Sequence, residues 1–247
     1  MFKDAQVSLR GLLRRHLISL LGGDWEEIHN EYGMYTITCR AKAMARTLEK
    51  CDRLKDGKIT QKNFYRKLPD LVAARLVVVD PDDIFRLAEK VRNMCIEPLF
   101  CKPDSPLVCA KVRHGRLSMY NVRAFEDTRA YTITTEETGY CSVHFVFRTG
   151  AEFYSRLCHD EEMKDLRALD LKGLIGLDAW HVEIQVRTIM DEAWGETDHF
   201  VRYEDSGLRD DPEIRDQFAA LASYLQAANH HVSLIRNAAR RRKKALA

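Results

Sequence analysis

The sequence predicts an α/β or α+β domain, in which a mixed β-sheet is flanked by helices. An apolar, β-branched run from 72 to 79 lies between Pro69 and Pro81, which is typical of a buried central strand. Residues 180 to 187 alternate apolar and polar side chains, which indicates a second strand. From about Pro212 onward, a periodic apolar stripe predicts a long helix. The stripe runs through Phe218, Leu221, Leu225, Val232 and Ile235.

The other expected elements alternate between helix and strand. Residues 5 to 30 favour one or two amphipathic helices, interrupted at Gly22 and Gly23. Asp82 and Asp83 are placed to begin a helix that runs to about Arg92, because acidic side chains suit the positive end of a helix dipole. The remaining expectations are a basic helix from 41 to 55, short strands and turns from 95 to 125, a strand from 142 to 148, a mixed segment from 150 to 178 with a helix near 159 to 169, and a helix from 189 to 203.

Composition is that of an ordinary soluble domain. The chain has 247 residues, enough for one large domain with helical extensions, and 45% of them are hydrophobic and 31% charged. No apolar stretch is long enough to span a bilayer, and the run from 17 to 21 is too short for a secretory signal, so we expect a cytoplasmic protein. Seven scattered cysteines without a C-x-x-C pair argue against a zinc site or a disulfide framework and favour reduced thiols.

The strand from 180 to 187 carries an unusual polar face. Glu183, Gln185 and Arg187 share one side, while apolar residues occupy the other. An acid, an amide and a guanidinium in one row can hold a metal ion, a phosphate and a hydroxyl together. The alternative is an edge strand whose polar face meets solvent.

The segment that begins at Glu183 resembles the signature of the RelA/SpoT nucleotide pyrophosphokinase domain, roughly E-x-Q-x-R-T, a Met, W-A-x-x-E-H and a closing Tyr. Here Gly195 replaces the Ala, Asp198 replaces the Glu, and Tyr203 closes the motif. Three further segments match in order and bring the resemblance to about residues 35 to 205. They are Arg40-Ala41-Lys42 with Lys50, the D-x-x-A-x-R segment from Asp70 to Arg75, and the G-Y-x-S-x-H segment from Gly139 to His144.

The resemblance implies a nucleotidyltransferase-like core that transfers the β,γ-pyrophosphate of ATP to a 3′-hydroxyl, usually of GDP or GTP, to give ppGpp or pppGpp. The synthetase domain would cover 35–205, with an N-terminal helical extension at 1–34 and a C-terminal helix with a basic tail at 206–247. The hydrolase domain of longer relatives needs many more residues and several metal-binding histidines, whereas His159-Asp160 is an isolated dipeptide in this sequence. The given sequence therefore resembles a small, synthetase-only member. Members of this type often form homo-oligomers.

The resemblance also assigns roles to particular residues. Asp70 would bind Mg²⁺, and Glu183 would be either the second Mg²⁺ ligand or the general base toward the attacking hydroxyl. The ATP-binding set would be Arg40, Lys42, Arg46, Lys50 and Arg75. The acceptor-binding set would be Tyr140, which would stack on the base, with Ser142, His144, Gln185, Arg187 and His199. Simpler roles stay open: a turn before the strand for Asp70, an ion pair for Arg75, and core packing for Tyr140, His144 and Trp194.

Departures from the family pattern concentrate on the acceptor side. Glu136 stands at a family Lys, Ala130 at an Asp, Cys141 at an Arg or Gln, and Arg46 at a Ser, although Tyr131 is kept. An anion at position 136 disfavours a phosphate-rich acceptor by charge alone. The alternatives are therefore the tRNA 3′ end, as in toxic relatives, an adenine nucleotide that gives (p)ppApp, or a non-catalytic nucleotide-binding module.

The chain ends in a basic run from Arg240 to Lys244. Cations at a helix C-terminus suit the helix dipole, which explains the run without any partner. The functional alternative is a contact with tRNA or another nucleic acid through its phosphates.

Overall fold

The computed structural model describes residues 2–42, 68, 70–94, 107–115, 118–148, 181–203, 208 and 211–246. Several predictions lie outside these residues. They concern Arg46, Lys50, the rest of the basic helix, the segment from 150 to 178 with His159-Asp160, and four of the cysteines.

The described residues form a six-stranded mixed sheet in the order β1-β2-β6-β5-β3-β4. Pairing is parallel between β2 and β6 and between β3 and β4, and antiparallel elsewhere. The strands are β1 (Met34–Ala41), β2 (Val72–Val78), β3 (Leu107–Gly115), β4 (Thr132–Glu136), β5 (Ser142–Arg148) and β6 (His181–Thr188). The predicted central strand β2 is confirmed. β6 is also central, so the alternative of a solvated edge strand is wrong.

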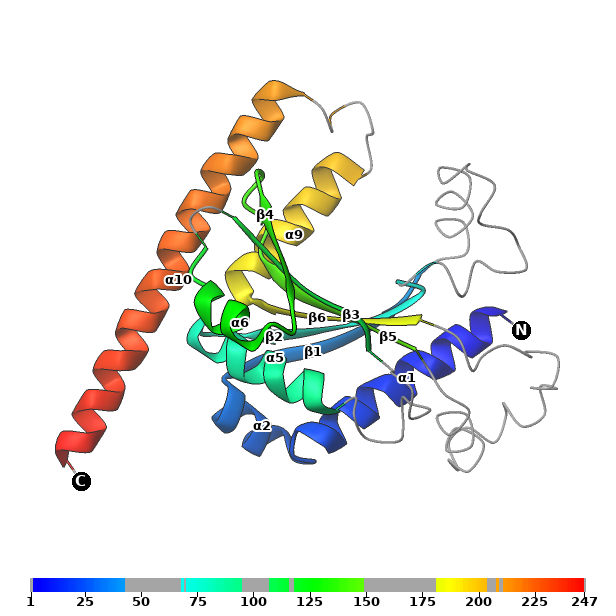
Figure 1. Ribbon diagram of the computed structural model, residues 1–247, viewed down its shortest axis with the longest axis horizontal. Coiled ribbons are helices and arrows are strands. Elements are labelled where there is room, and N and C mark those ends of the chain that lie inside the picture. Colours follow the sequence, from blue (N-terminus) through cyan, green and yellow to red (C-terminus); the bar gives the residue numbers. More distant parts are fainter. Residues whose placement is uncertain are drawn as a thin grey trace.

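Helices cover both faces of the sheet (Figure 1). One face carries α1 (Phe2–Leu21), α2 (Trp25–Tyr32) and α5 (Asp82–Met94), and the main hydrophobic core lies beneath them. The opposite face carries α9 (Ile189–Asp198), which continues as a π-helix, η4 (His199–Tyr203). A short helix, α6 (Val122–Thr128), precedes β4, and the long α10 (Pro212–Leu246) packs against α9. Every helix among the described residues is too short or too polar to cross a lipid bilayer.

Local sequence explains where several helices begin and end. Asp24 caps α2 by accepting from the backbone N–H groups of Glu26 and Glu27, and Gly33 ends it in the left-handed conformation. Thr188 and Asp191 form a reciprocal capping box at the start of α9. The predicted break between the first two helices and the predicted start of α5 are both confirmed.

Three sequence predictions need correction. Arg40 and Ala41 belong to strand β1, so the basic helix does not begin at residue 41. The stretch from 95 to 125 was expected to hold only strands and turns, yet α6 begins within it, with Asn121 as its N-cap. Ile235 was placed on the buried stripe of α10 but is 70% exposed. The buried face of that helix is more polar than expected and consists of Phe218, Ala222, Gln226, Asn229 and Ser233.

Candidate active site

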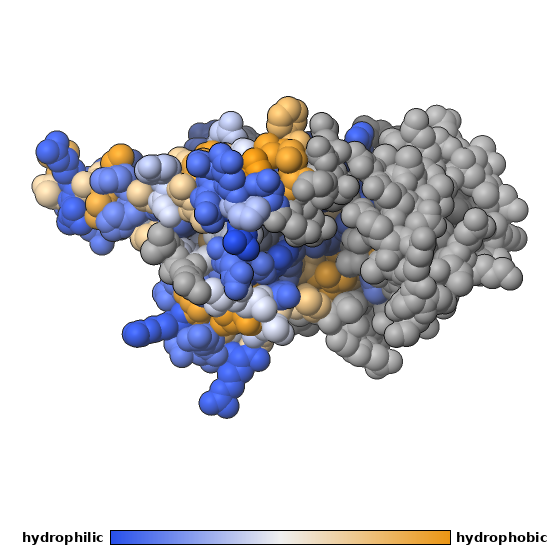
Figure 2. Space-filling view, turned by 90° about the horizontal axis from the view of Figure 1, so that it is seen from above, coloured by the Kyte–Doolittle hydropathy of each residue, from blue (hydrophilic) through white to orange (hydrophobic). Residues whose placement is uncertain are grey.

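Polar and charged side chains are gathered on the sheet face that α9 covers. Pairing sets Arg75 of β2 opposite Gln185 of β6, Gln185 opposite His144 of β5, and His144 opposite Lys111 of β3. Residues paired across a sheet project from the same face. This row therefore brings three of the predicted site residues together with a lysine that the sequence analysis missed. The surface on this side is mostly hydrophilic, with smaller apolar patches (Figure 2).

Glu183 lies one step along the same face, in a second row. Ala73 is its neighbour on β2, and Arg40 of β1 pairs with Ala73. Two strand spacings separate Arg40 from Glu183, or roughly 10 Å. The intervening side chain is the methyl group of Ala73, which is itself buried.

A chain of hydrogen bonds runs from Glu183 to Tyr140. His144 Nδ1 lies 3.0 Å from Glu183 Oε1, and His144 Nε2 lies 3.1 Å from the Tyr140 hydroxyl. An ionised carboxylate can only accept, so Nδ1 carries the proton of the neutral imidazole and Nε2 accepts from the Tyr140 hydroxyl. That hydroxyl also accepts from Arg187 Nη2 at 3.1 Å. Gln185 Nε2 donates to the other oxygen of Glu183 at 2.8 Å.

These contacts set the charge state of the pair. Burial acts to raise the pKa of Glu183, but the hydrogen bonds from His144 and from the Gln185 amide help to outweigh burial, so the pKa falls below its ordinary value. Burial lowers the pKa of His144 despite the adjacent carboxylate. At neutral pH, Glu183 is therefore an anion and His144 is neutral.

Asp70 and Glu183 fit a site for a hard divalent cation. Asp70 lies in the turn before β2, and its charge reaches Glu183, where it opposes the lowering of that carboxyl's pKa. Lys42 Nζ lies 2.6 Å from Asp70 Oδ2 and neutralises it. Two carboxylates suit Mg²⁺, which keeps several waters and takes its other oxygens from phosphate. The described residues hold no cluster of three or more His, Cys, Asp or Glu that would form an all-protein metal cage.

Arg75 forms the ion pairs that were its simpler alternative. Its Nη1 lies 2.7 Å from Glu192 Oε1 and also contacts Glu196, both on α9. Burial acts to lower the pKa of Arg75, but these two carboxylates outweigh it and raise the pKa. The guanidinium remains on the polar face. A phosphate could reach it only in competition with the α9 carboxylates.

The ring of Tyr140 lies among cations and aromatic rings. The Arg113 guanidinium carbon lies 4.8 Å from the ring centroid, and that of Arg187 lies 5.5 Å from it. Trp194, which is buried as expected for a core residue, has its ring centroid 5.5 Å away. The Arg113 guanidinium therefore lies closer to this ring than the Arg187 guanidinium does.

Arg113 changes the interpretation of Glu136. Arg113 Nε donates to Glu136 Oε1 at 2.7 Å, so the anion at the family's lysine position is paired with a cation from β3. Lys111 and Arg113 were both missed by the sequence analysis. The signal was present, because they alternate with the buried Ala110 and Val112.

Other predicted residues have mainly structural contacts. Ser142 is fully buried, and its hydroxyl donates to the Val186 carbonyl at 3.4 Å. Cys141 turns away from the polar face and accepts from the Gly115 amide, and burial raises its pKa to about 12. His199 is exposed at the far end of α9, about 15 Å along the helix from its start.

Arg187 is held tightly within this cluster. Its side chain is 3% exposed, donates to Gln185, and lies 3.1 Å from Glu192 Oε2. Gly195 faces it directly, because a Cβ at that position would lie 2.6 Å from Arg187 Nη1. The glycine that replaces the family's alanine therefore gives room to this guanidinium.

Comparison with solved structures shows which known proteins share this fold. The small alarmone synthetase 1 from Bacillus subtilis matches with a TM-score of 0.59 at 20% identity, over 97% of this chain and 94% of that one. The same synthetase bound to its product pppGpp matches at 0.56, again at 20% identity, over 96% and 93% of the two chains. A GTP pyrophosphokinase family protein from Streptococcus pneumoniae matches at 0.53 and 17% identity, over 96% and 87%. Comparisons with family models and with curated proteins give no match. The mixed sheet, its flanking helices and the long C-terminal helix thus make up the fold of the small alarmone synthetases, as the resemblance implied.

Proposed function

We propose that this chain is an ATP-dependent pyrophosphokinase that transfers the β,γ-pyrophosphate of ATP to the 3′-hydroxyl of GDP or GTP, with AMP as the other product. The observation that carries the proposal is the ionised, hydrogen-bonded Glu183 on a sheet face that also presents Arg40, Arg75 and Lys111. A fixed carboxylate surrounded by cations suits transfer between two phosphate-rich nucleotides.

The donor side would be formed by β1 and β2. Arg40 and Lys42 lie at the end of β1, beside Asp70, and Arg75 lies farther along β2. These cations would neutralise the triphosphate and orient it for in-line attack. Mg²⁺, held by Asp70, would supply further charge neutralisation on the phosphates. Lys42 would then move from Asp70 to a phosphate oxygen.

The transfer step requires one proton acceptor. The acceptor's 3′-oxygen attacks the β-phosphorus of ATP, the bond from that phosphorus to the α,β-bridging oxygen breaks, and AMP leaves. Glu183 would accept a hydrogen bond from the attacking hydroxyl and take its proton. A carboxylate with a lowered pKa is a weak base, but a loose phosphoryl-transfer transition state depends chiefly on position and charge. His144 and Gln185 would hold Glu183 in that position.

The contacts of the acceptor side remove the charge argument against a phosphate-rich nucleotide such as GDP or GTP. The charge argument against GDP and GTP rested on Glu136, and Arg113 neutralises that carboxylate. Arg113 is also placed to turn toward an acceptor phosphate when a base stacks on Tyr140. The product-bound synthetase with the same fold holds pppGpp, a phosphate-rich guanine nucleotide.

Incubation with γ-labelled ATP and Mg²⁺ tests the proposal. GDP, GTP, AMP, ADP and deacylated tRNA are offered in parallel, and Glu183→Gln is the inactive control. Label on GDP or GTP supports it. Label found only on an adenine nucleotide or on tRNA would identify that molecule as the acceptor and rule out GDP and GTP. No transfer to any acceptor would favour a non-catalytic binding module.

A further inference from the structure

The C-terminal end of α10 concentrates positive charge. After Asp216 the chain contains no acidic residue, and six cations follow from Arg236 to Lys244. The chain as a whole carries only +2, so the remainder is net negative. The helix end protrudes from the body of the molecule, where hydrophilic residues are mixed with smaller apolar ones (Figures 1 and 2).

This helix end forms one wall of an open groove of ≈ 380 Å³. The opposite wall is made by the end of α2, with His29 and Asn30, and by the connections that flank β1 and β2. Arg240 and Lys243 line the groove from α10, and no carboxylate lines it. The groove therefore offers cations on one side and hydrogen-bonding side chains on the other.

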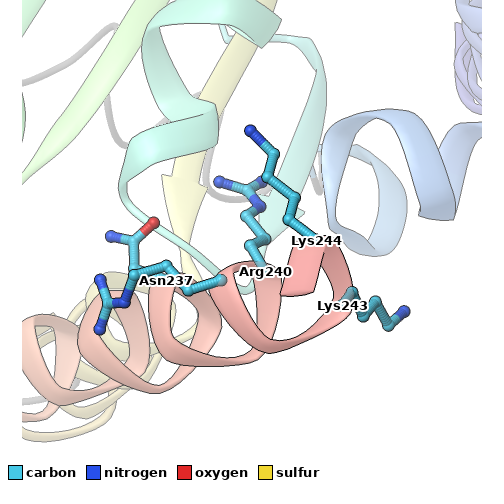
Figure 3. A pocket seen from close by; sticks show the side chains of 5 residues that line it. Asn237, Arg240, Lys243 and Lys244 are labelled. Atoms are coloured by element: carbon cyan, nitrogen blue, oxygen red, sulfur yellow. The ribbon is translucent and has the colours of Figure 1, made fainter. Parts of the chain in front are cut away.

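A second hollow of ≈ 370 Å³ continues along α10 itself. Asn237, Arg240, Arg241, Lys243 and Lys244 line it. Arg240 and Lys244 rise from the same side of the helix, whereas Lys243 lies apart from them (Figure 3). The cations thus extend over more than one side of the helix end and present a broad charged surface.

Most of this charge is not neutralised by the protein. Arg236 is ion-paired with Asp80 and Asp83, which fastens the helix to the end of β2 and the start of α5. The four cations at 240, 241, 243 and 244 form no ion pair within the part of the chain that the structure describes. Like charges three and four residues apart destabilise a helix, so an anionic partner would stabilise this end.

The groove is separate from the candidate active site. Val79, which follows β2, lines the groove, while Arg75, the site residue of β2 nearest to it, lies four residues back, or about 13 Å along the strand. Asp70 precedes the same strand, at the other end of the site. None of the residues that line the groove belongs to the candidate active site.

The chemistry of the surface favours a phosphodiester strand over a membrane. A helix that binds a membrane surface needs bulky apolar side chains opposite its charges. Beyond Arg236 the helix offers only alanines and a terminal Leu246. The helix dipole can account for cations in the last turn of α10, but it does not account for cations that line a groove against α2. A run of phosphates would match several cations at once.

We propose that the groove between α2 and the end of α10 binds a single-stranded nucleic acid through its phosphates, at a site distinct from the transfer site. Arg240, Arg241, Lys243 and Lys244 hold the strand. Four phosphate contacts give a slope of about −3 for log K against log[salt], since each contributes about −0.7 on a single strand.

Fluorescence anisotropy with a labelled 20-nucleotide RNA and the DNA of the same sequence tests the proposal between 50 and 200 mM KCl. The full-length chain is compared with a variant in which Arg240, Arg241, Lys243 and Lys244 are all replaced by Gln, which keeps helix propensity and removes the charge. The matched control replaces the exposed Arg10, Lys90, Arg123 and Arg215 by Gln and removes the same charge elsewhere.

The expected result is at least a tenfold loss of affinity and a flatter salt slope for the α10 variant, with circular dichroism unchanged and affinity nearly kept in the control. A variant with Arg240→Lys and Arg241→Lys should still bind. Equal losses in the two Gln variants, competition by ATP with GDP, or tighter binding to vesicles containing anionic lipid than to either strand would overturn the proposal. Preference between RNA and DNA identifies the kind of strand.

Pyrophosphate transfer by the α10 variant should persist, which separates this test from that of the proposed function.

Discussion

Arg113 is the cation of the proposed acceptor side, and its replacement should leave the sheet intact because its side chain is partly exposed. Its side chain is 36% exposed, lies 4.8 Å from the Tyr140 ring centroid and pairs with Glu136. Arg113→Ala would remove the cation over the Tyr140 ring and the proposed phosphate contact, together worth about 1.4 kcal/mol, which is about tenfold in affinity. We expect the KM for GDP or GTP to rise about tenfold, while the KM for ATP stays within about twofold.

The partner substitution should act in the opposite direction. Glu136→Gln releases Arg113 from a partly exposed ion pair worth about 0.5 to 1 kcal/mol after solvent screening. The freed guanidinium becomes available to the acceptor, so the acceptor KM should fall by about two- to fivefold. If the two substitutions change the acceptor KM in opposite directions, the ion pair affects acceptor binding and is not purely structural.

Initial rates with the acceptor varied at saturating ATP provide the measurement. Arg92→Ala is the matched control, because Arg92 pairs with Glu89 at the same 2.7 Å on α5, on the opposite face of the sheet. It should change neither KM. The reasoning is refuted if Arg113→Ala and Glu136→Gln raise the acceptor KM together, or if Arg92→Ala raises it as much as Arg113→Ala.

Three further predictions concern catalysis, backbone strain and pH. Glu183→Gln should lower kcat at least about 100-fold with an unchanged circular dichroism spectrum, whereas Glu89→Gln should keep its rate; an active Glu183→Gln enzyme would contradict the assignment. Gly33→Ala should lower the free energy of unfolding in urea by about 1 to 3 kcal/mol, because φ is 59° and the new Cβ would lie 2.5 Å from Asp83 Oδ2; unchanged stability would show that the chain relaxes there. Burial lowers the pKa of His144, so its contribution to stability is fully present above about pH 6.5 and is lost as pH falls toward the folded-state pKa. Between pH 7 and 5, urea titrations should therefore show wild type losing more stability than His144→Gln, and parallel losses would count against this.

The strands that the sequence predicted best have strong local patterns. The apolar run of β2 and the alternation of β6 are visible without any knowledge of their partners. Strand β1 was missed although Thr36, Ile37 and Thr38 favour extended structure. A basic helix at Arg40 and Lys42 is implied only by the resemblance, whereas the local β-propensity of the preceding residues favours the strand that forms.

Partners across the sheet were beyond the reach of the sequence. Glu136 looked like an uncompensated anion because its partner Arg113 is 23 residues away. Only the parallel register of β3 and β4, which pairs Gly115 with Glu136, brings the two side chains together. Likewise, Glu192 could not be recognised as the partner of Arg75 until α9 was placed over the sheet.

The long C-terminal helix is a wall of the candidate site as well as an extension. Gly139, with φ of 81°, passes so close to α10 that a Cβ there would clash with Ala222. The Trp194 indole, which lies beside Tyr140, donates to the Phe218 carbonyl of the same helix at 3.2 Å.

Polar contacts fix the position of α10 along its own axis relative to α9. Gln226 Nε2 donates to the buried Asp191 Oδ1 at 2.8 Å, while its Oε1 accepts from the Met119 amide at 3.1 Å. An apolar seam could slide by one turn at small cost, whereas this amide can satisfy both partners at only one position. Because Asp191 also caps α9, one buried carboxylate sets the position of both helices that border Tyr140. The polar character of the α10 seam, which the sequence analysis did not expect, thus fixes the two helices that border Tyr140.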